Sequence, residues 1–180
     1  GELAGSTWTF NAWGENYDPY DQDALMGQRI LQRVGAPCFA SSLVCEGGAV
    51  TVDGEGTIIT TETCVLNENR NPGWTRDQVS GELCRTLGAE KVIWLYGDPF
   101  EEETNGHVDG IAAFIEPGRV LFETMDDSED PFFPIMQRNL AELQQQADAR
   151  GRELKIDFIH SGDYANARGD RDCKSYINAY

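Results

Sequence analysis

The stretch that decides the fold is Leu43-Val-Cys-Glu-Gly-Gly-Ala-Val-Thr-Val-Asp-Gly-Glu-Gly-Thr-Ile-Ile-Thr-Thr61. Valine and isoleucine alternate with threonine on either side of its centre, which is typical of β-strands. The central Asp53-Gly-Glu-Gly56 segment is made of residues that tight turns favour. The sequence therefore predicts a β-hairpin over residues 43–61.

A helix and a buried strand are predicted after this hairpin. Thr75 and Gln78 form a capping-box pattern at the start of the helix, and Gly88 is typical of a helix end. Three apolar residues recur every fourth position on one face: Val79, Leu83 and Leu87. Residues 91–96, Lys-Val-Ile-Trp-Leu-Tyr, are too apolar for a surface strand, so we expect them to be buried.

The same order of hairpin, helix and strand recurs further along the chain. It consists of a hairpin over 107–115 and 119–124, a long helix over 133–150 and a strand over 153–159. A shift of 63 residues lays the first hairpin on the second, with five matched pairs: Gly47 with Gly110, Val52 with Ile115, Ile58 with Leu121, Ile59 with Phe122 and Thr61 with Thr124. Repetition of one supersecondary unit is typical of a propeller or a solenoid.

This repeat predicts an α/β fold of ββαβ units within one partial domain. Residues 1–42 are interpreted as the end of one unit, residues 43–97 and 98–160 as two further units, and residues 175–180 as the first strand of another. The first of these regions contains three expected elements: a strand at 8–13, a helix at 24–34 and a short strand at 37–40. We therefore expect the chain to be cut from something larger at both ends.

Composition limits the classes of function. Of the 180 residues, 31 are Asp or Glu and 14 are Lys or Arg, which gives a formal net charge of −17. This charge argues against nucleic-acid binding, which needs basic residues to neutralise phosphates, but it suits a small cationic ligand. No apolar run is long enough for a membrane span and no signal peptide is present, so we expect no membrane contact. The oligomeric state stays open, with a homo-oligomer as one alternative.

The five cysteines favour a reducing, cytoplasmic compartment. Their number is odd and no CxxC pair occurs, so neither a disulfide framework nor a zinc site is predicted. Cys173, near Arg171 and Lys174, is the best candidate for an exposed reactive thiol. The other four are expected to have structural or incidental roles: Cys38, Cys45, Cys64 and Cys84.

Two carboxylates and one histidine are the candidates for chemistry. His107 and Asp109 are two residues apart on a predicted strand, so both side chains are expected on one face. The shift of 63 residues places Glu46 on Asp109, and units arranged round an axis would bring these carboxylates together. A histidine held by one carboxylate and facing another can serve as an acid/base centre. The alternative is that His107 caps a strand end and Asp109 is a turn residue.

The sequence predicts no metal site and no nucleotide cofactor. His107 and His160 are the two histidines, whereas a structural zinc site takes four Cys or His ligands. Residues 126–130 resemble the start of a calcium loop, but Pro131 stands where glycine belongs and Gln137 where glutamate belongs.

Several motifs together resemble the agmatine deiminase family. They are Phe10-Asn-Ala-Trp-Gly14, Glu46-Gly-Gly48, Asp53-Gly-Glu-Gly-Thr57, Thr61-Glu-Thr-Cys-Val-Leu-Asn-Glu-Asn-Arg-Asn-Pro72, Asn105-Gly-His-Val-Asp109 and Ser175-Tyr-Ile-Asn178. The resemblance implies the pentein fold, a five-bladed α/β propeller of ββαβ units, of which this chain would cover about two and a half. It also implies hydrolysis of agmatine to N-carbamoylputrescine and ammonia, a step of polyamine and putrescine biosynthesis.

The resemblance also implies residue roles. Asp109 would grip the guanidinium of the substrate, and Glu46 would hold His107 and contribute to substrate binding. His107 would protonate the leaving ammonia and then activate water. In the family a cysteine thiolate attacks the guanidinium carbon, and its motif is expected beyond Tyr180, while a second guanidinium-binding aspartate is expected before Gly1. No cofactor is implied.

Two other functions stay open. Peptidylarginine deiminases, which act on protein arginine, share much of this pattern, and their site must admit a polypeptide. A non-catalytic module could instead hold guanidinium or polyamine cations with the same carboxylates. Turnover of agmatine against peptidyl-arginine separates the two enzymes, and a downstream cysteine motif separates an enzyme from the binding module.

Overall fold

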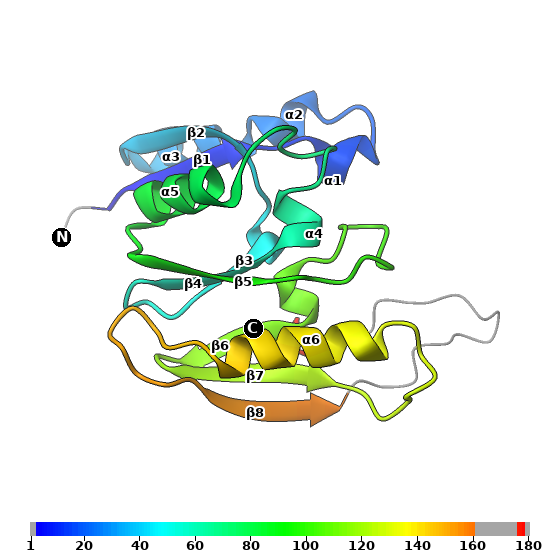
Figure 1. Ribbon diagram of the computed structural model, residues 1–180. Helices are drawn as coiled ribbons and strands as arrows, with labels where there is room; N and C mark the ends of the chain where they lie inside the picture. Colours follow the sequence, from blue (N-terminus) through cyan, green and yellow to red (C-terminus); the bar gives the residue numbers. More distant parts are fainter. Residues whose placement is uncertain (1–2, 161–175, 179–180) are drawn as a thin grey trace.

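Three small β-sheets lie one above another in this protein (Figure 1). The computed structural model describes residues 3–160 and 176–178. The first sheet has two strands and the other two have three strands each, and the strands follow chain order within every sheet. The fold class is therefore α/β, as the sequence predicts.

The second sheet contains the predicted hairpin. Its strands are β3 (Val50–Val52), β4 (Thr57–Thr61) and β5 (Lys91–Leu95), with the helices α4 (Glu62–Val65) and α5 (Arg76–Leu87) between β4 and β5. Strand β3 pairs antiparallel with β4, and β4 pairs parallel with β5. In the turn, Asp53 accepts hydrogen bonds from the backbone N–H groups of Glu55 and Thr57 at 2.8 Å each. The hairpin is confirmed, although it begins at Val50 and not at residue 43.

Helix α5 begins and ends as its sequence predicts. The Thr75 hydroxyl accepts a hydrogen bond from the Gln78 backbone N–H at 3.3 Å, and the Gln78 side chain accepts one from the Thr75 N–H at 2.8 Å. Gly88 ends the helix with φ at 67°, a left-handed conformation that glycine adopts without steric cost. Of the predicted apolar face, Val79 and Leu83 are buried, whereas Leu87 is exposed.

The third sheet repeats this topology. Its strands are β6 (Ala112–Glu116), β7 (Arg119–Thr124) and β8 (Lys155–His160), and helix α6 (Phe133–Gln144) connects β7 to β8. Strand β6 pairs antiparallel with β7, and β7 pairs parallel with β8. Two consecutive ββαβ units are therefore confirmed.

Helix α6 ends at Gln144, so the predicted end at residue 150 is wrong. Asp148 is buried, and its carboxylate accepts hydrogen bonds from the backbone N–H groups of Arg150 and Arg152 at 2.9 Å each. A carboxylate that binds nearby backbone groups competes with continuation of a helix. A tight turn therefore leads into β8.

The two units correspond at a shift of 62 residues, so the predicted shift of 63 is wrong by one. Strand β4 begins at Thr57 and β7 at Arg119, and β3 and β6 differ by the same number. Packing agrees, because Ile58 belongs to the apolar cluster under α5 and Val120 to the cluster under α6. Successive side chains point to opposite faces of a strand, so a shift of 63 would place Ile58 on the wrong face.

The N-terminal sheet differs from its prediction. Strand β1 (Gly5–Thr9) pairs parallel with β2 (Cys38–Val44). The strand expected at 8–13 is wrong, because β1 ends at Thr9 and the chain then turns into the short α1 (Ala12–Glu15). The boundary expected between residues 42 and 43 falls inside β2.

Two further helices, α2 (Asp21–Ala24) and α3 (Met26–Val34), connect α1 to β2. The helix predicted at 24–34 is confirmed in α3. Of the strand predicted at 175–180, residues 176–178 form a bend. The rest of that segment, except these three residues, lies outside the described residues, as does Cys173.

Each long helix is packed between two sheets (Figure 1). Helix α5 contacts β5 of its own sheet and β2 of the preceding one, and α6 contacts β5 as well as the core of its own sheet. No helix in the described part of the chain is long and apolar enough to cross a membrane.

Asn139 ties α6 to the end of β5. This fully buried side chain accepts hydrogen bonds from the backbone N–H groups of Tyr96 and Gly97, at 2.8 and 3.2 Å, and donates one to the Gly97 carbonyl at 3.0 Å. Residues 96 and 97 have no helix or strand of their own to satisfy these groups. Asn139 thus fixes the start of the loop that leads to the candidate site.

Asn139→Ala is expected to lower the free energy of unfolding by about 2–4 kcal/mol, because three backbone groups lose a buried partner. Urea unfolding of the protein that carries this chain measures the change. Gln144→Ala, at an exposed position of the same helix, is the matched control and should cost under about 0.5 kcal/mol. Equal effects of the two substitutions would contradict the role given to Asn139.

Candidate active site

A cavity of about 1010 Å³ lies beside the turns that precede the second and third sheets. Aromatic side chains of residues 10, 13, 100 and 132 form part of its wall. Its described lining holds no lysine or arginine and seven carboxylates: Asp23, Glu46, Asp98, Glu101, Glu102, Glu103 and Asp109. Such a lining attracts cations and repels anions.

Two short 3₁₀ turns bring the candidate residues together. They are η1 (Gly47–Ala49), which precedes β3, and η2 (Val108–Gly110), which precedes β6, and the two turns contact each other. Strands β3 and β6 also contact each other, and the Phe114 backbone N–H donates to the Thr51 hydroxyl at 3.1 Å. Equivalent ends of two repeated units therefore meet at one place.

The residue equivalent to Glu46 is His107, and not Asp109 as the sequence predicts. Glu46 directly precedes η1, and His107 directly precedes η2. His107 and Asp109 do not lie on a strand, but on this turn their side chains still come together, with His107 Nδ1 3.9 Å from Asp109 Oδ1. All three predicted site residues line the cavity.

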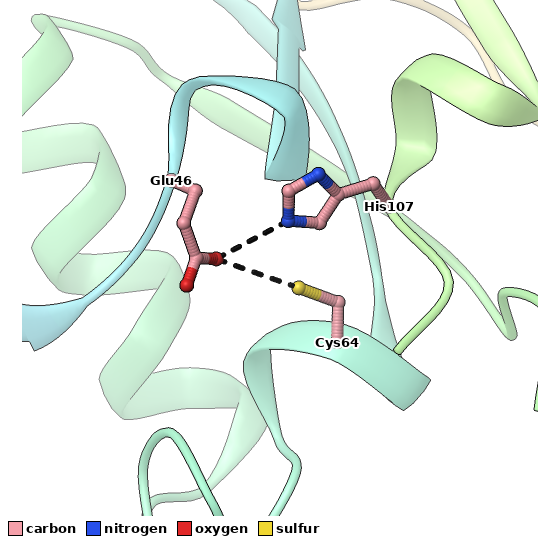
Figure 2. Close-up of side chains that lie close together, drawn as sticks. All are labelled: Glu46, Cys64 and His107. Carbon is pink, nitrogen blue, oxygen red and sulfur yellow. Dashed lines mark hydrogen bonds and ion pairs between the residues drawn. The ribbon is translucent and has the colours of Figure 1, made fainter. Parts of the chain in front are cut away.

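Glu46 and His107 form a buried pair (Figure 2). His107 Nε2 lies 3.3 Å from Glu46 Oε2. Burial raises the pKa of Glu46, but the hydrogen bond with His107 and the charges of Arg70 and His107 outweigh burial and hold the pKa below its ordinary value. The carboxylate is thus ionised and can only accept, so His107 carries a proton on Nε2 and presents Nδ1 toward Asp109.

Asp109 is the more accessible carboxylate, with its side chain 31% exposed. Burial raises its pKa, the charge of His107 opposes that rise, and Glu101 adds to it. A cation bound in the cavity would favour its charged form. The arrangement therefore combines a cation-binding carboxylate with a histidine that can move a proton.

Gly48 permits the close approach of these groups. A Cβ atom there would lie 2.4 Å from Asp109 Oδ2 and 2.5 Å from His107 Nδ1, whereas one on Gly47 would meet no atom within 4 Å. The second glycine of the Glu-Gly-Gly motif is therefore a steric requirement of the site.

The comparisons with known proteins agree with this geometry. The family model of the Porphyromonas-type peptidyl-arginine deiminases matches residues 2–180. The chain belongs to this family. It is 45% identical over 161 residues to an agmatine deiminase of Pseudomonas syringae pv. tomato, covering 87% of this chain and 44% of that protein.

Solved structures of other deiminases confirm the pentein fold. An agmatine deiminase of Enterococcus faecalis, described as catalysing its reaction, superposes with a TM-score of 0.89 at 36% identity over 98% of this chain and 55% of that one. A cysteine-to-serine variant of C. jejuni agmatine deiminase, with substrate bound, gives 0.84 at 25% identity over 99% of this chain and 52% of that one. The chain spans about half the length of the relatives that it matches.

The described thiols near the deiminase site are poor nucleophiles. Burial and then the charge of Glu46 raise the pKa of both Cys45 and Cys64, and burial raises the pKa of Cys84. A thiolate is the reactive form of cysteine, so protonated thiols are inert. Structural roles for Cys45 and Cys64 agree with this geometry.

Three groups near the deiminase site could offer ligands to a metal ion. Atoms of Glu46, Cys64 and His107 lie within 4.8 Å of one another. However, Glu46 Oε1 is bonded to the Arg70 guanidinium at 2.8 Å, and the thiol of Cys64 is held in its protonated form. The donor set therefore does not suit a resident cation.

Sequence reasoning missed two groups that support the site. Arg70, in a polar loop, is buried against Glu46. Glu101 accepts hydrogen bonds from the backbone N–H groups of three residues of the loop before His107: Glu103, Thr104 and Gly106. The signal for Glu101 was its place in the acidic run directly before the Asn-Gly-His-Val-Asp motif.

Proposed function

We propose that the protein to which this chain belongs hydrolyses agmatine to N-carbamoylputrescine and ammonia. The observation that carries the proposal is the convergence of Glu46, His107 and Asp109 in one cavity lined with carboxylates. Agmatine suits this cavity, since it carries a guanidinium at one end and an ammonium at the other. Relatives named agmatine deiminase support the same reaction.

The residues divide the reaction as follows. Asp109 binds the guanidinium through charge-assisted hydrogen bonds, and Glu46 contributes negative charge to the site. A cysteine thiolate attacks the guanidinium carbon, and the C–N bond breaks as His107 gives a proton to the leaving ammonia. Water then attacks the same carbon and gives a proton to His107, and the C–S bond breaks to release the ureido product and the thiolate.

The nucleophilic cysteine is proposed to come from a part of the protein outside this chain, as is a second aspartate for the guanidinium. The buried, protonated state of Cys45 and Cys64 supports this assignment. The product leads toward putrescine and other polyamines. The free thiols at residues 38, 45, 64 and 84 support a reducing cytoplasm as the place of the reaction.

The proposal is tested by the products and substrates of the full-length protein. Ammonia release and ureido formation are measured with agmatine, free arginine and an arginine-containing peptide. We expect kcat/KM for agmatine to exceed that for the peptide at least about 10²-fold, because a single pocket that accepts the free ammonium end discriminates against a polypeptide. Faster turnover of the peptide would assign the peptidylarginine reaction instead, and binding of agmatine without ammonia release would assign a binding module.

A further inference from the structure

Arg70 is the most completely enclosed charge near the candidate site. Its side chain is inaccessible to solvent, and its guanidinium donates to four acceptors. They are Glu46 Oε1 at 2.8 Å, Asn69 Oδ1 at 2.8 Å, Asn105 Oδ1 at 2.6 Å and the Thr104 carbonyl at 3.1 Å. Loops that carry two catalytic candidates therefore share one planar donor.

The first loop carries Glu46. Arg70 binds Oε1 of this carboxylate through Nε, while His107 Nε2 lies beside Oε2. The two oxygens are thus divided between a permanent cation and the histidine. The groups that face the Glu46 carboxylate are Cys45 from the end of β2, Cys64 from α4, Arg70 from the loop after α4, and His107.

The second loop leads directly into His107. Asn105 is held in a left-handed conformation, with φ at 63°, and its side-chain oxygen accepts hydrogen bonds from both Arg70 and Asn69. Holding a non-glycine residue in this conformation costs of the order of 1 kcal/mol, so it needs support from its surroundings. Arg70 supplies that support two residues before the histidine.

A third segment packs against the same guanidinium. A Cβ atom on Gly14 would lie 2.5 Å from Arg70 Nη1, and the Gly14 N–H is itself held by Asn11 Oδ1 at 3.0 Å. Gly14 belongs to the left-handed turn α1, whose Trp13 lines the cavity. Arg70 therefore meets the three segments that provide Glu46, His107 and the aromatic wall.

From this geometry we infer that Arg70 is a positioning residue for the proposed reaction, which it serves by fixing Glu46 and the His107 loop in register. The inference rests on the proposed function. Arg70 does not line the cavity, so it acts through Glu46 and Asn105 and not on the substrate. Lysine would keep the charge but could not reach several acceptors in a plane.

The test uses the full-length protein with five variants: Arg70→Lys, Arg70→Gln, Glu46→Gln, the double Glu46→Gln/Arg70→Gln variant, and Arg76→Gln as control. Arg76 forms a half-exposed ion pair with Glu62 on α5, so the control removes an arginine of the same kind outside the site. Circular dichroism and thermal melting establish which variants are folded.

We expect Arg70→Gln to lower kcat about 10²-fold with KM for agmatine changed less than about threefold, because the acid/base group is displaced while the guanidinium site stays. Arg70→Lys should recover part of the loss. The acidic limb of the kcat profile should move to higher pH in Arg70→Gln, because Glu46 loses a cation that lowers its pKa. Arg76→Gln should leave kcat within about twofold of the parent protein.

Coupling to Glu46 separates positioning from a general structural role. If Arg70 acts through Glu46, Arg70→Gln should lower kcat by less than about threefold in the Glu46→Gln background. An equal loss in both backgrounds, or a folded Arg70→Gln protein with the kcat of the parent, would overturn the inference. If Arg70→Gln does not fold, the same criteria apply to Arg70→Lys.

A spectroscopic readout keeps the inference independent of the reaction. The proton on His107 Nε2 faces Glu46, so its NMR resonance should shift in Arg70→Gln and Arg70→Lys but not in Arg76→Gln. A protein that shows this shift but releases no ammonia from agmatine would refute the proposed function and leave the positioning role intact. An unshifted resonance in a folded Arg70 variant would refute the positioning role.

Discussion

Replacing His107 by asparagine is expected to lower kcat for agmatine by about 10²–10⁴-fold. Asparagine is similar in size and can still donate to Glu46 Oε2, but it cannot take up or release a proton near neutral pH. The leaving ammonia would lose its proton donor, and the water that hydrolyses the intermediate would lose its base. Ammonia release by the full-length protein under saturating agmatine measures the effect.

His160 provides the matched control for this substitution. It is the other histidine of the chain, its side chain is 64% exposed, and it lies 3.5 Å from the exposed carboxylate of Asp126. His160→Asn should leave kcat within about twofold of the parent protein. Near-normal turnover by His107→Asn would show that another group moves the proton.

Gly48→Ala is expected to reduce kcat/KM about 10²-fold or more, although it adds one methyl group. The new Cβ would overlap the positions of His107 Nδ1 and Asp109 Oδ2, so one of these side chains must leave its place. A displacement of about 1 Å at a reacting group is enough for a loss of this size. Steady-state kinetics with agmatine measure it.

The neighbouring glycine is a strict control for this prediction. Gly47→Ala adds the same methyl group in the same turn, where no atom lies within 4 Å, so its kcat/KM should stay within a few-fold of the parent protein. Both variants should remain folded, because the affected side chains lie at a cavity. Equal activity of the two variants would mean that His107 and Asp109 do not need to approach the backbone here.

Local patterns predicted the elements of the two units well. The Thr75 and Gln78 capping box, the glycine at the end of α5 and the Asp53 turn are signals that lie within a few residues of what they specify. The order of hairpin, helix and strand could therefore be derived from the chain alone. The repeat followed from that order.

The shift between the units was harder, for a physical reason. Strand β4 is buried on both faces, so Ile58 and Ile59 are both apolar and the pattern does not show which of them faces α5. The two hairpins also differ in their turns, because a register irregularity precedes the turn of the third sheet. A slip of one residue then passes unnoticed in sequence, although it exchanges the two faces of the strand.

The supports of the site could not be predicted from the residues around them. The segment around Arg70 is rich in asparagine, which is typical of a solvated loop. Instead Asn71 is buried and binds the Val44 N–H at 2.9 Å and the carbonyls of Val44 and Val65 at 2.8 Å each. Only the fold shows that these polar side chains satisfy buried backbone groups.

The sharing of each long helix between two sheets determines how the protein can come apart. Ile93 and Leu95 of β5 belong to the same apolar cluster as Met136 and Leu143 of α6, so the cover of one unit is encoded in the next. Cutting the chain between residues 97 and 98 would leave the β5 face bare in one piece and the inner face of α6 bare in the other. The repeats visible in the sequence are therefore not autonomous folding modules, and melting of one blade removes the support of the blade before it.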